Sequence, residues 1–267
     1  MGAMSDSPAR LWRALVSADP SRPFVTAYDD LGDRIELSRA TLDNWVSKTS
    51  NMLVDGFGTQ PGDRIALSLP PHWQSLAWAL SCWSVGARAV LTGGGDAPEV
   101  AVAGPDQLAA ALDGGAEEVV GTSLDPLGLP LREVPPMVID YTVEVRGHGD
   151  HFPAYPVDAA EPALESADRV LSGAEVVAAG RDLAKAWDLG ERDRLAVVVA
   201  PGAPLAALGS DLAVLTAAIA SGTPLVLTPP PREGGLQAFL DRMGSEGVTV
   251  LFGDEPEGGL PFRRVSL

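Results

Sequence analysis

The stretch that decides the fold is PGDRIALSLPPHWQSLAWALSCWSVGARAVLT, residues 61–92. After a Pro-Gly-Asp turn, residues 64–69 are apolar enough for a buried strand, which a Pro-Pro pair ends. Residues 72–85 predict a helix that stops at Gly86, and residues 88–92 predict a second strand. A strand, a helix and a strand in this order indicate a βαβ unit with two parallel strands.

The same alternation extends in both directions from this unit. Upstream, two β-rich runs surround an Asp-Asp-Leu-Gly-Asp turn, which predicts a hairpin over residues 24–37. Ser38 then stands where a helix N-cap belongs, before helical spacing that runs to Gly56. Downstream, we expect strands at residues 100–103 and 118–120, with a helix near residues 106–112 between them. This order predicts a mostly parallel sheet with helices on its faces.

The later part of the chain repeats this order. Ser172 and Glu175 have the spacing of a capping box, which predicts a helix to about Trp187. The offset between matching positions drifts from 130 residues, for Arg64 and Arg194, to 136, for Gly86 and Gly222. The remaining expected elements are strands at residues 194–200, 224–227 and 248–252 and helices at residues 210–220 and 236–246. The sequence therefore predicts a duplicated α/β architecture.

We expect two related Rossmann-like lobes, each a mostly parallel sheet flanked by helices. The first lobe is placed at residues 1–126 and the second at residues 167–267. The segment between them, residues 127–166, is rich in proline and is interpreted as a connection that is partly extended, with one β-rich patch over residues 137–145.

Charge and composition exclude several classes of function. The 267 residues include 36 Asp and Glu against 19 Lys and Arg, a formal net charge of −17, which argues against nucleic acid as a partner. No run of 18 apolar residues and no leader peptide is present, so we expect no membrane partner and a cytoplasmic protein. Cys82, the single cysteine, excludes a disulfide framework or a thiolate metal cage and is expected to be buried.

Several of these motifs resemble the large domain of the AMP-binding, adenylate-forming enzymes, which include the acyl-CoA synthetases. The sequence at residues 28–30, 36–38 and 44–49 resembles more closely still a group of short actinobacterial proteins with distant AMP-binding similarity. The resemblance implies the fold of that large domain. The segments that carry it are residues 35–42 (IELSRATL), 61–70 (PGDRIALSLP), 83–87 (WSVGA), 193–201 and 220–227 (ASGTPLVL).

The departures from that family decide the expected activity. The family has a Gly-rich loop with a lysine, which wraps the phosphates of ATP, directly before the helix that starts at Ser172. The matching residues, 158–168, contain four carboxylates and neither glycine nor lysine. The chain ends at Leu267, before the family's ribose-binding aspartate motif, its aromatic-Gly-x-Thr-Glu motif and its small C-terminal domain. We therefore expect a non-catalytic relic, a pseudoenzyme, with no cofactor and no metal.

Three other groups of residues could carry chemistry. A Gly-rich turn after a strand, Gly93, Gly94, Gly95 and Asp96, is a candidate phosphate cradle, although a simple strand exit explains it as well. His148, Asp150 and His151 gather two of the three histidines with a carboxylate but have no further ligand nearby in sequence, which favours a solvated loop. The tryptophans at positions 45, 73, 78, 83 and 187 could line an acyl pocket, although such residues more often pack in a core.

Three functions remain open. The first is a protein-interaction or regulatory module, with a protein partner or a second copy of the chain bound to an exposed apolar face. The second is a small-molecule binder that keeps an acyl or nucleotide cleft between the lobes. The third is an enzyme of different chemistry that uses residues 93–96 or 148–151.

Overall fold

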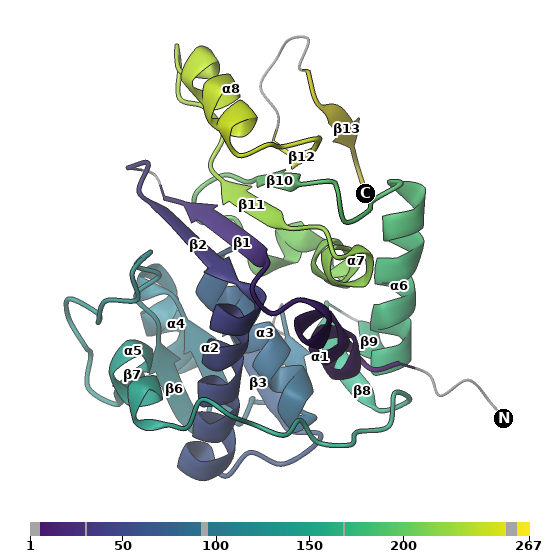
Figure 1. Cartoon of the computed structure of the whole chain (residues 1–267). Coiled ribbons are helices and arrows are strands. Elements are labelled where there is room, and N and C mark those ends of the chain that lie inside the picture. The colour runs from purple at the N-terminus through teal and green to yellow at the C-terminus, as the bar shows by residue number, and fades with distance from the viewer. Residues whose placement is uncertain (1–5, 30, 92–95, 168, 255–260) are drawn as a thin grey trace, which may run out of the picture.

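The computed structural model describes residues 6–29, 31–91, 96–167, 169–254 and 261–267 and contains two β-sheets (Figure 1). The six-stranded sheet, sheet A, has the order β13-β12-β10-β11-β1-β2. The seven-stranded sheet, sheet B, has the order β7-β6-β5-β3-β4-β8-β9. Among the strand pairs of the described residues, β1–β2 and β8–β9 alone are antiparallel, which confirms the expected α/β class with two mostly parallel sheets.

The bounds of the elements follow the predicted alternation closely. The strands are β1 (Pro23–Tyr28), β2 (Arg34–Ser38), β3 (Arg64–Ser68), β4 (Arg88–Val90), β5 (Val100–Ala103), β6 (Glu118–Gly121), β7 (Val138–Asp140), β8 (Pro162–Ser166), β9 (Arg169–Ser172), β10 (Leu195–Val198), β11 (Leu225–Thr228), β12 (Val250–Gly253) and β13 (Arg263–Val265). The α-helices are α1 (Pro8–Ala18), α2 (Arg39–Asn51), α3 (Trp73–Val85), α4 (Leu108–Asp113), α5 (Tyr141–Glu144), α6 (Gly173–Ala186), α7 (Ala213–Ser221) and α8 (Leu236–Ser245). A π-helical turn, η1 (Met52–Gly56), extends α2, and short 3₁₀ turns are η2 (Pro105–Gln107), η3 (Val145–Gly147) and η4 (Leu205–Leu208).

The two βαβ units match each other as the sequence repeat predicts. In β3-α3-β4 and in β10-α7-β11 the two strands are parallel neighbours. Both helices end at a glycine in the left-handed region, Gly86 at φ 78° and Gly222 at φ 70°. Ser38 and Ser172 are N-caps, and Glu175 completes the predicted capping box.

Each sheet also includes strands that are distant in sequence from its other strands. The hairpin β1–β2 pairs with β11 in sheet A, although it lies within residues 1–126, and β8 pairs with β4 in sheet B, 75 residues after it at the pair Val90 and Glu165. The sheets therefore do not coincide with the ranges expected for the two lobes. The division into folding units near residues 126 and 166 stays a prediction.

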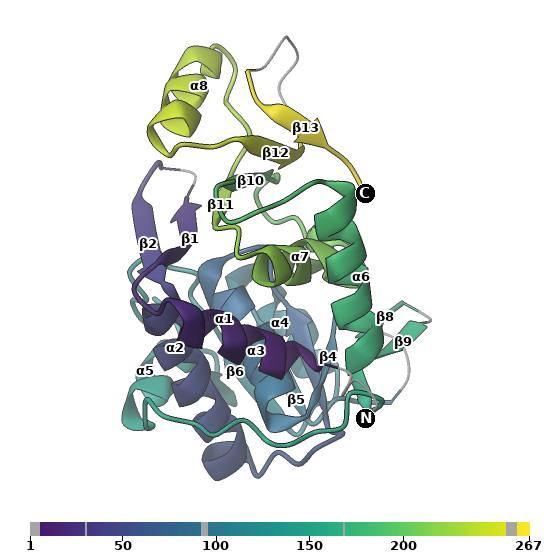
Figure 2. The same ribbon diagram turned by 45° about the vertical axis from the view of Figure 1, so that its right-hand side comes forward.

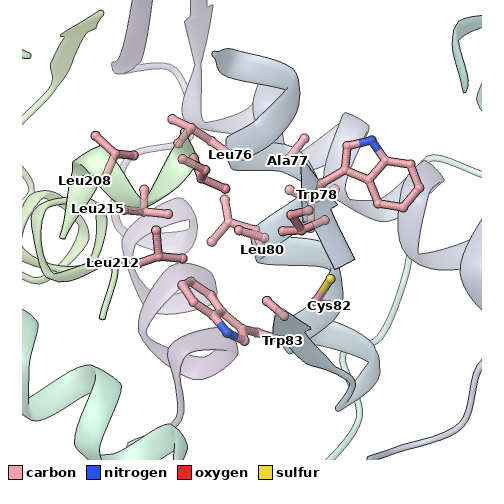
Figure 3. Close-up of a cluster of buried hydrophobic side chains, with 14 of the residues drawn as sticks. Leu76, Ala77, Trp78, Leu80, Cys82, Trp83, Leu208, Leu212 and Leu215 are labelled. Atoms are coloured by element: carbon pink, nitrogen blue, oxygen red, sulfur yellow. The ribbon is translucent and has the colours of Figure 1, made fainter. Parts of the chain in front are cut away.

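The layers are held together by α3, the helix from the opening motif. All thirteen of its residues are buried, because it contacts β3 and β4 of sheet B, β1 of sheet A, and helices α1 and α2. Figure 3 shows Leu76 and Leu80 on the side that faces Leu208, Leu212 and Leu215 of the other half, with Trp78 on the far side. A helix that is apolar all round needs burial on every side, which this position supplies.

Two shorter helices cover the outer faces of the sheets. Along β10, Leu195 and Val197 face the central core, whereas Ala196 and Val198 pack with Phe239 of α8. On sheet B, α4 covers β5, β6 and β7 through a small core of Ala103, Leu108, Val119 and Val138. The result is a layered molecule with α8 at one end and the edge of sheet B that carries α4 and α5 at the other (Figures 1 and 2).

The proline-rich segment differs in part from the expectation. Of the β-rich patch over residues 137–145, only Val138–Asp140 is a strand, and the helix α5 begins at Tyr141. The reason is local: Asp140 caps α5 by accepting hydrogen bonds from the backbone N–H groups of Thr142 and Val143. The helix α1 and the strand β13 were not predicted.

A buried arginine joins three helices. Arg39 is 2% exposed and donates to the carbonyl oxygens of Leu15, in the last turn of α1, and of Gly222, after α7. It is itself the first residue of α2. Among the described residues, no carboxylate forms an ion pair with it, and burial lowers the pKa of its guanidinium. Its energetic role is to satisfy the carbonyl groups at two helix ends.

We expect Arg39→Met to lower the free energy of unfolding by about 1–3 kcal/mol, because it leaves two carbonyl oxygens without their donor. Chemical denaturation measures this change. Arg10→Met, at an exposed position of α1, is the control and should change it little. Equal effects of the two substitutions would contradict the role assigned to Arg39.

Candidate functional site

The carboxyl ends of the parallel strands form a crevice in each sheet. In open α/β sheets, ligands bind where the connections from neighbouring strands leave toward opposite faces. In sheet B this point lies between β3, which is followed by the central helix α3, and β5, which is followed by α4 on the outer face. In sheet A it lies between β10, followed by α7, and β11, followed by α8.

The sheet-B crevice has a volume of about 340 Å³. It is bounded by the end of β3, by the start of η2 after β5, and by the loop after β10 of the other sheet. Among its described lining residues the only titratable side chain is that of Asp106, which is exposed. The residues that define it are Leu67, Ser68, Pro70, Gly104, Leu124 and Gly202.

The sheet-A crevice is larger, about 550 Å³, and more charged. It lies between the prolines that follow β10 and β11, the tip of the β1–β2 hairpin and the start of α8. The guanidinium of Arg242 lies 4.8 Å from the centre of the Tyr28 ring, and its Nη1 donates to the Thr228 hydroxyl at 3.3 Å. The residues that define this crevice are Asp29, Leu31, Pro201, Pro230, Arg232 and Arg242.

One loop separates the two crevices and joins the sheets. Pro201 lines the sheet-A crevice, whereas Gly202 and Pro204 line the sheet-B crevice. The backbone N–H of Leu205 donates to the carbonyl oxygen of Leu69 at 2.7 Å, which ties this loop to the end of β3. The two crevices are therefore neighbours at the junction of the sheets. The second of the three functions left open by the sequence, a small-molecule binder, expects a cleft between the two lobes.

The lining of the crevices is mostly apolar side chains and backbone. Their described lining residues include no His, Cys or Lys, and Ser68 has no base beside it among them. A nucleophile without a hydrogen-bonded base is weak. The crevices offer apolar surface, backbone groups and, in sheet A, two guanidinium groups.

The segment at the position of the family's phosphate loop contains the strand β8. Residues 162–166 form β8, which pairs antiparallel with β9 from Pro162 and Ser172 to Ser166 and Arg169. A loop that wraps a triphosphate needs several consecutive backbone N–H groups that are free to point at it. In this segment the sheet pairs of β8 take up the neighbouring backbone.

One of the four carboxylates in this segment is paired inside the fold. Glu165 is 8% exposed and pairs with Arg64 Nη2 at 2.7 Å and Arg88 Nη1 at 3.2 Å. The hydrogen bond from Arg64 is the main reason that the pKa of Glu165 lies below its ordinary value. The charge of this carboxylate is therefore balanced by two arginines, and the expected repulsion of a triphosphate depends on the other carboxylates of the segment.

The other candidate residues lie apart from both crevices. Gly93, Gly94 and Gly95 fall outside the described residues, and Asp96 is exposed, with its carbonyl oxygen bonded to Arg64. His148 and His151 lie beside η1 and α2, where Lys48 donates to the carbonyl of His148 at 2.6 Å. Among the residues that the structure describes, no group of three or more His, Cys, Asp or Glu could hold a metal ion.

The tryptophans belong to the packing of the core. The Trp45 and Trp73 rings lie 5.0 Å apart, and Trp78 lies 5.0 Å from Tyr141. Trp83 donates to the Ala163 carbonyl and Trp187 to that of Ser266. Neither crevice has any of these five among its described lining residues. Cys82 is fully buried, which raises the pKa of its thiol.

Sequence reasoning did not identify the crevice residues Ser68, Gly104, Gly202 and Arg242. The available signal was their position: each of the first three follows or ends a predicted strand, where ligand loops gather. Which strand ends meet depends on the order of strands in the sheets, and this order is not visible in the sequence.

His72 lies close to this junction, and its pKa is lower than the ordinary value for histidine. Its Nδ1 accepts from the backbone N–H of Gln74 at 3.3 Å and so caps α3 in the neutral form. Burial lowers the pKa of His72 to about 4, although Asp125 and Asp29 oppose the shift. Between pH 6.5 and about 4 the unfolded chain binds this proton more readily than the folded protein, so stability falls as the pH is lowered.

We expect His72→Asn to flatten this loss of stability, because asparagine caps a helix without titrating. Denaturation at pH 7 and at pH 4.5 gives the difference in unfolding free energy between the two conditions. His151→Asn, at an exposed histidine, should keep the wild-type difference. If His72→Asn showed the same difference between the two pH values as the wild type, the neutral cap at His72 would not be the source of the loss of stability.

Within the described part of the chain, no helix has the length and the apolar character needed to cross a bilayer.

No protein-family model matches the chain, but single relatives do. It is 37% identical over 244 residues to a TIGR03089 family protein of Mycobacterium tuberculosis, a match that covers 88% of this chain and 93% of that protein. Such identity over nearly the whole of both chains indicates shared descent.

Solved structures with a similar fold are acyl-CoA synthetases. The Brucella canis acyl-CoA synthetase matches with a TM-score of 0.74 at 17% identity, over 94% of this chain and 48% of its own. The acetoacetyl-CoA synthetase of Streptomyces lividans matches with a TM-score of 0.74 at 19% identity, over 92% of this chain and 42% of its own. The N-terminal domain of FACL13 from Mycobacterium tuberculosis matches with 0.71 at 15%, over 93% and 62%. The chain thus has the fold of their N-terminal part and spans about half their length.

Proposed function

The chain belongs to the TIGR03089 family, and from this premise we propose that it is a non-catalytic relative of the adenylate-forming enzymes that acts in the cytoplasm as a protein-interaction or regulatory module. The observation that carries the proposal is the pairing of β8 on both of its edges. Residues 162–166 lie in the segment where the resemblance places a loop that wraps phosphates, and they pair with β9 on one side and with β4 on the other. A backbone that is taken up by two neighbouring strands has few N–H groups free to wrap a triphosphate.

The crevices support the same conclusion. Acyl transfer through an adenylate needs groups that stabilise the charge on the transferring phosphate. The sheet-B crevice has one exposed carboxylate among its described titratable lining groups, and this would repel a phosphate. The sheet-A crevice has arginines, but Arg242 already contacts Thr228 and the Tyr28 ring.

A role in protein interaction is supported by the surface of the proline-rich segment. Among the described residues, eight large apolar side chains are exposed, and five of these lie between positions 127 and 143. A gathering of exposed apolar side chains in one segment is typical of a contact surface.

We expect the purified protein to give no ATP–pyrophosphate exchange above the enzyme-free blank with Mg²⁺ and a panel of short, medium and long carboxylic acids. An acyl-CoA synthetase assayed in parallel shows that the conditions permit the reaction. Exchange that scales with the concentration of the protein would overturn the non-catalytic assignment.

A second candidate function, the binding of a small acyl or nucleotide ligand, is favoured by the sheet-B crevice alone. Its volume of about 340 Å³ lies at the lower end of the range of about 300–1,000 Å³ for ligand pockets. Its position at the switch point of the sheet is also the expected one.

For this second function, a thermal-shift panel of ATP with Mg²⁺, AMP, CoA and an acyl-adenylate mimic is the test. A ligand at 100 times its Kd adds about 2.7 kcal/mol, roughly 5–10 °C for a chain of this size. The shift should disappear in Ser68→Phe, which fills the crevice from an exposed position, and persist in Ser68→Ala. The absence of a shift with all four would remove this alternative.

A further inference from the structure

A third concave surface lies on the outer side of sheet B, next to the sheet-B crevice. This groove, of about 770 Å³, lies between α4 and the proline-rich segment at residues 130–135. Its apolar lining is Leu108, Leu112, Pro130, Leu131 and Pro135. The small core of α4 forms its floor, and Pro105 lines both the groove and the crevice.

Exposed apolar side chains flank the groove. Leu129 is 51% exposed and Val134 is 48% exposed, and each is the neighbour in sequence of a lining residue. Met137 is 86% exposed and has a backbone φ of 68°, in a region that a methionine rarely adopts. Because 86% of this side chain is exposed, its burial does not offset the cost of that backbone conformation.

Hydrogen bonds fix the wall that carries these side chains. The Asp125 carboxylate accepts from the N–H groups of Leu127 and Leu129, and Arg146 Nη2 donates to the carbonyl of Gly128 at 2.8 Å. The N–H of Leu131 donates to Asp140 Oδ2 at 2.8 Å. The wall therefore holds its shape in the free protein, and an occupant would not need to order it.

The charge around the groove selects the occupant. Residues 89–131 contain seven carboxylates and no Lys, Arg or His. Asp106, Asp113, Glu117 and Glu133, all exposed, stand on or next to the elements that form the groove. Among the described lining residues the one basic side chain is Arg132, and Arg146 of the wall is bonded to the Gly128 carbonyl. A second copy of the chain, with its own net charge of −17, is repelled, whereas a cationic segment is attracted.

We propose that this groove docks a segment of a partner protein that carries apolar side chains on one side and Lys and Arg on the other, a proposal that rests on the interaction role given above. The apolar side chains fill the space between Leu112 and Leu131. The cationic groups lie against the acidic residues of α4 and of the loop after it. The mode is that of an amphipathic segment in an apolar groove.

The test uses the full chain and two synthetic helical peptides with the same leucine face, one with lysines and the other with glutamates on the polar face. Fluorescence anisotropy should detect binding of the lysine peptide, weaker at high salt, and none of the glutamate peptide. The double variant Leu129→Gln, Val134→Gln should weaken binding at least tenfold. Val170→Gln, at a position 51% exposed on the edge strand β9, is the matched control and should leave it unchanged. All changed positions are exposed, so each variant is expected to fold.

Three results would overturn the inference: no binding of the lysine peptide at low salt, equal binding by the double variant, or a concentration-dependent self-association that the double variant abolishes. The last would make a second copy the occupant. These outcomes are distinct from a failure of the proposed function. ATP–pyrophosphate exchange would refute the non-catalytic role whether or not the peptides bind. If neither peptide binds and no exchange is seen, only the proposal for the groove is refuted.

Discussion

The burial of α3 on every side is the constraint on which the rest of the molecule depends. A helix that carries Trp73, Trp78 and Trp83, with Leu76 and Leu80 between them, has apolar side chains on every side and needs cover on each. One sheet covers only one face, so the second half of the chain must supply the opposite cover, and η4 and α7 do so through Leu208, Leu212 and Leu215. The same packing brings the carboxyl ends of both sheets together, and the two crevices exist because of it.

What the sequence predicts well is local. The capping box of Ser172 and Glu175, the N-cap at Ser38 and the glycine stop at Gly86 are all formed by neighbours in the chain, and all are confirmed. The partner of a strand is not local. Nothing in residues 24–37 indicates that β1 pairs with β11, since its apolar pattern fits a position beside either sheet. The crevice residues were missed for the same reason, because they are defined by the strands that stand side by side.

Charge and strand pairing bear in different ways on the proposal that this chain does not wrap a triphosphate. The carboxylates of residues 158–168 suggest repulsion, but Glu165 is held between Arg64 and Arg88 and contributes little to it. The pairing of β8 with both β4 and β9 takes up the backbone that such a loop would need. Because the sheets, caps and core do not depend on the chemistry of this segment, the same fold can be kept with or without it.

The exchange of hairpins between the sheets has a consequence for synthesis on the ribosome. Val25 of β1 pairs with Leu225 of β11, 200 residues later. At a synthesis rate of about 5–20 residues per second, the first hairpin waits roughly 10–40 s for its neighbour to be made. During this time the apolar residues Phe24 and Val25, buried in the finished protein, have no sheet to join. These residues therefore stay without their parallel partner strand until β11, Leu225–Thr228, has been made.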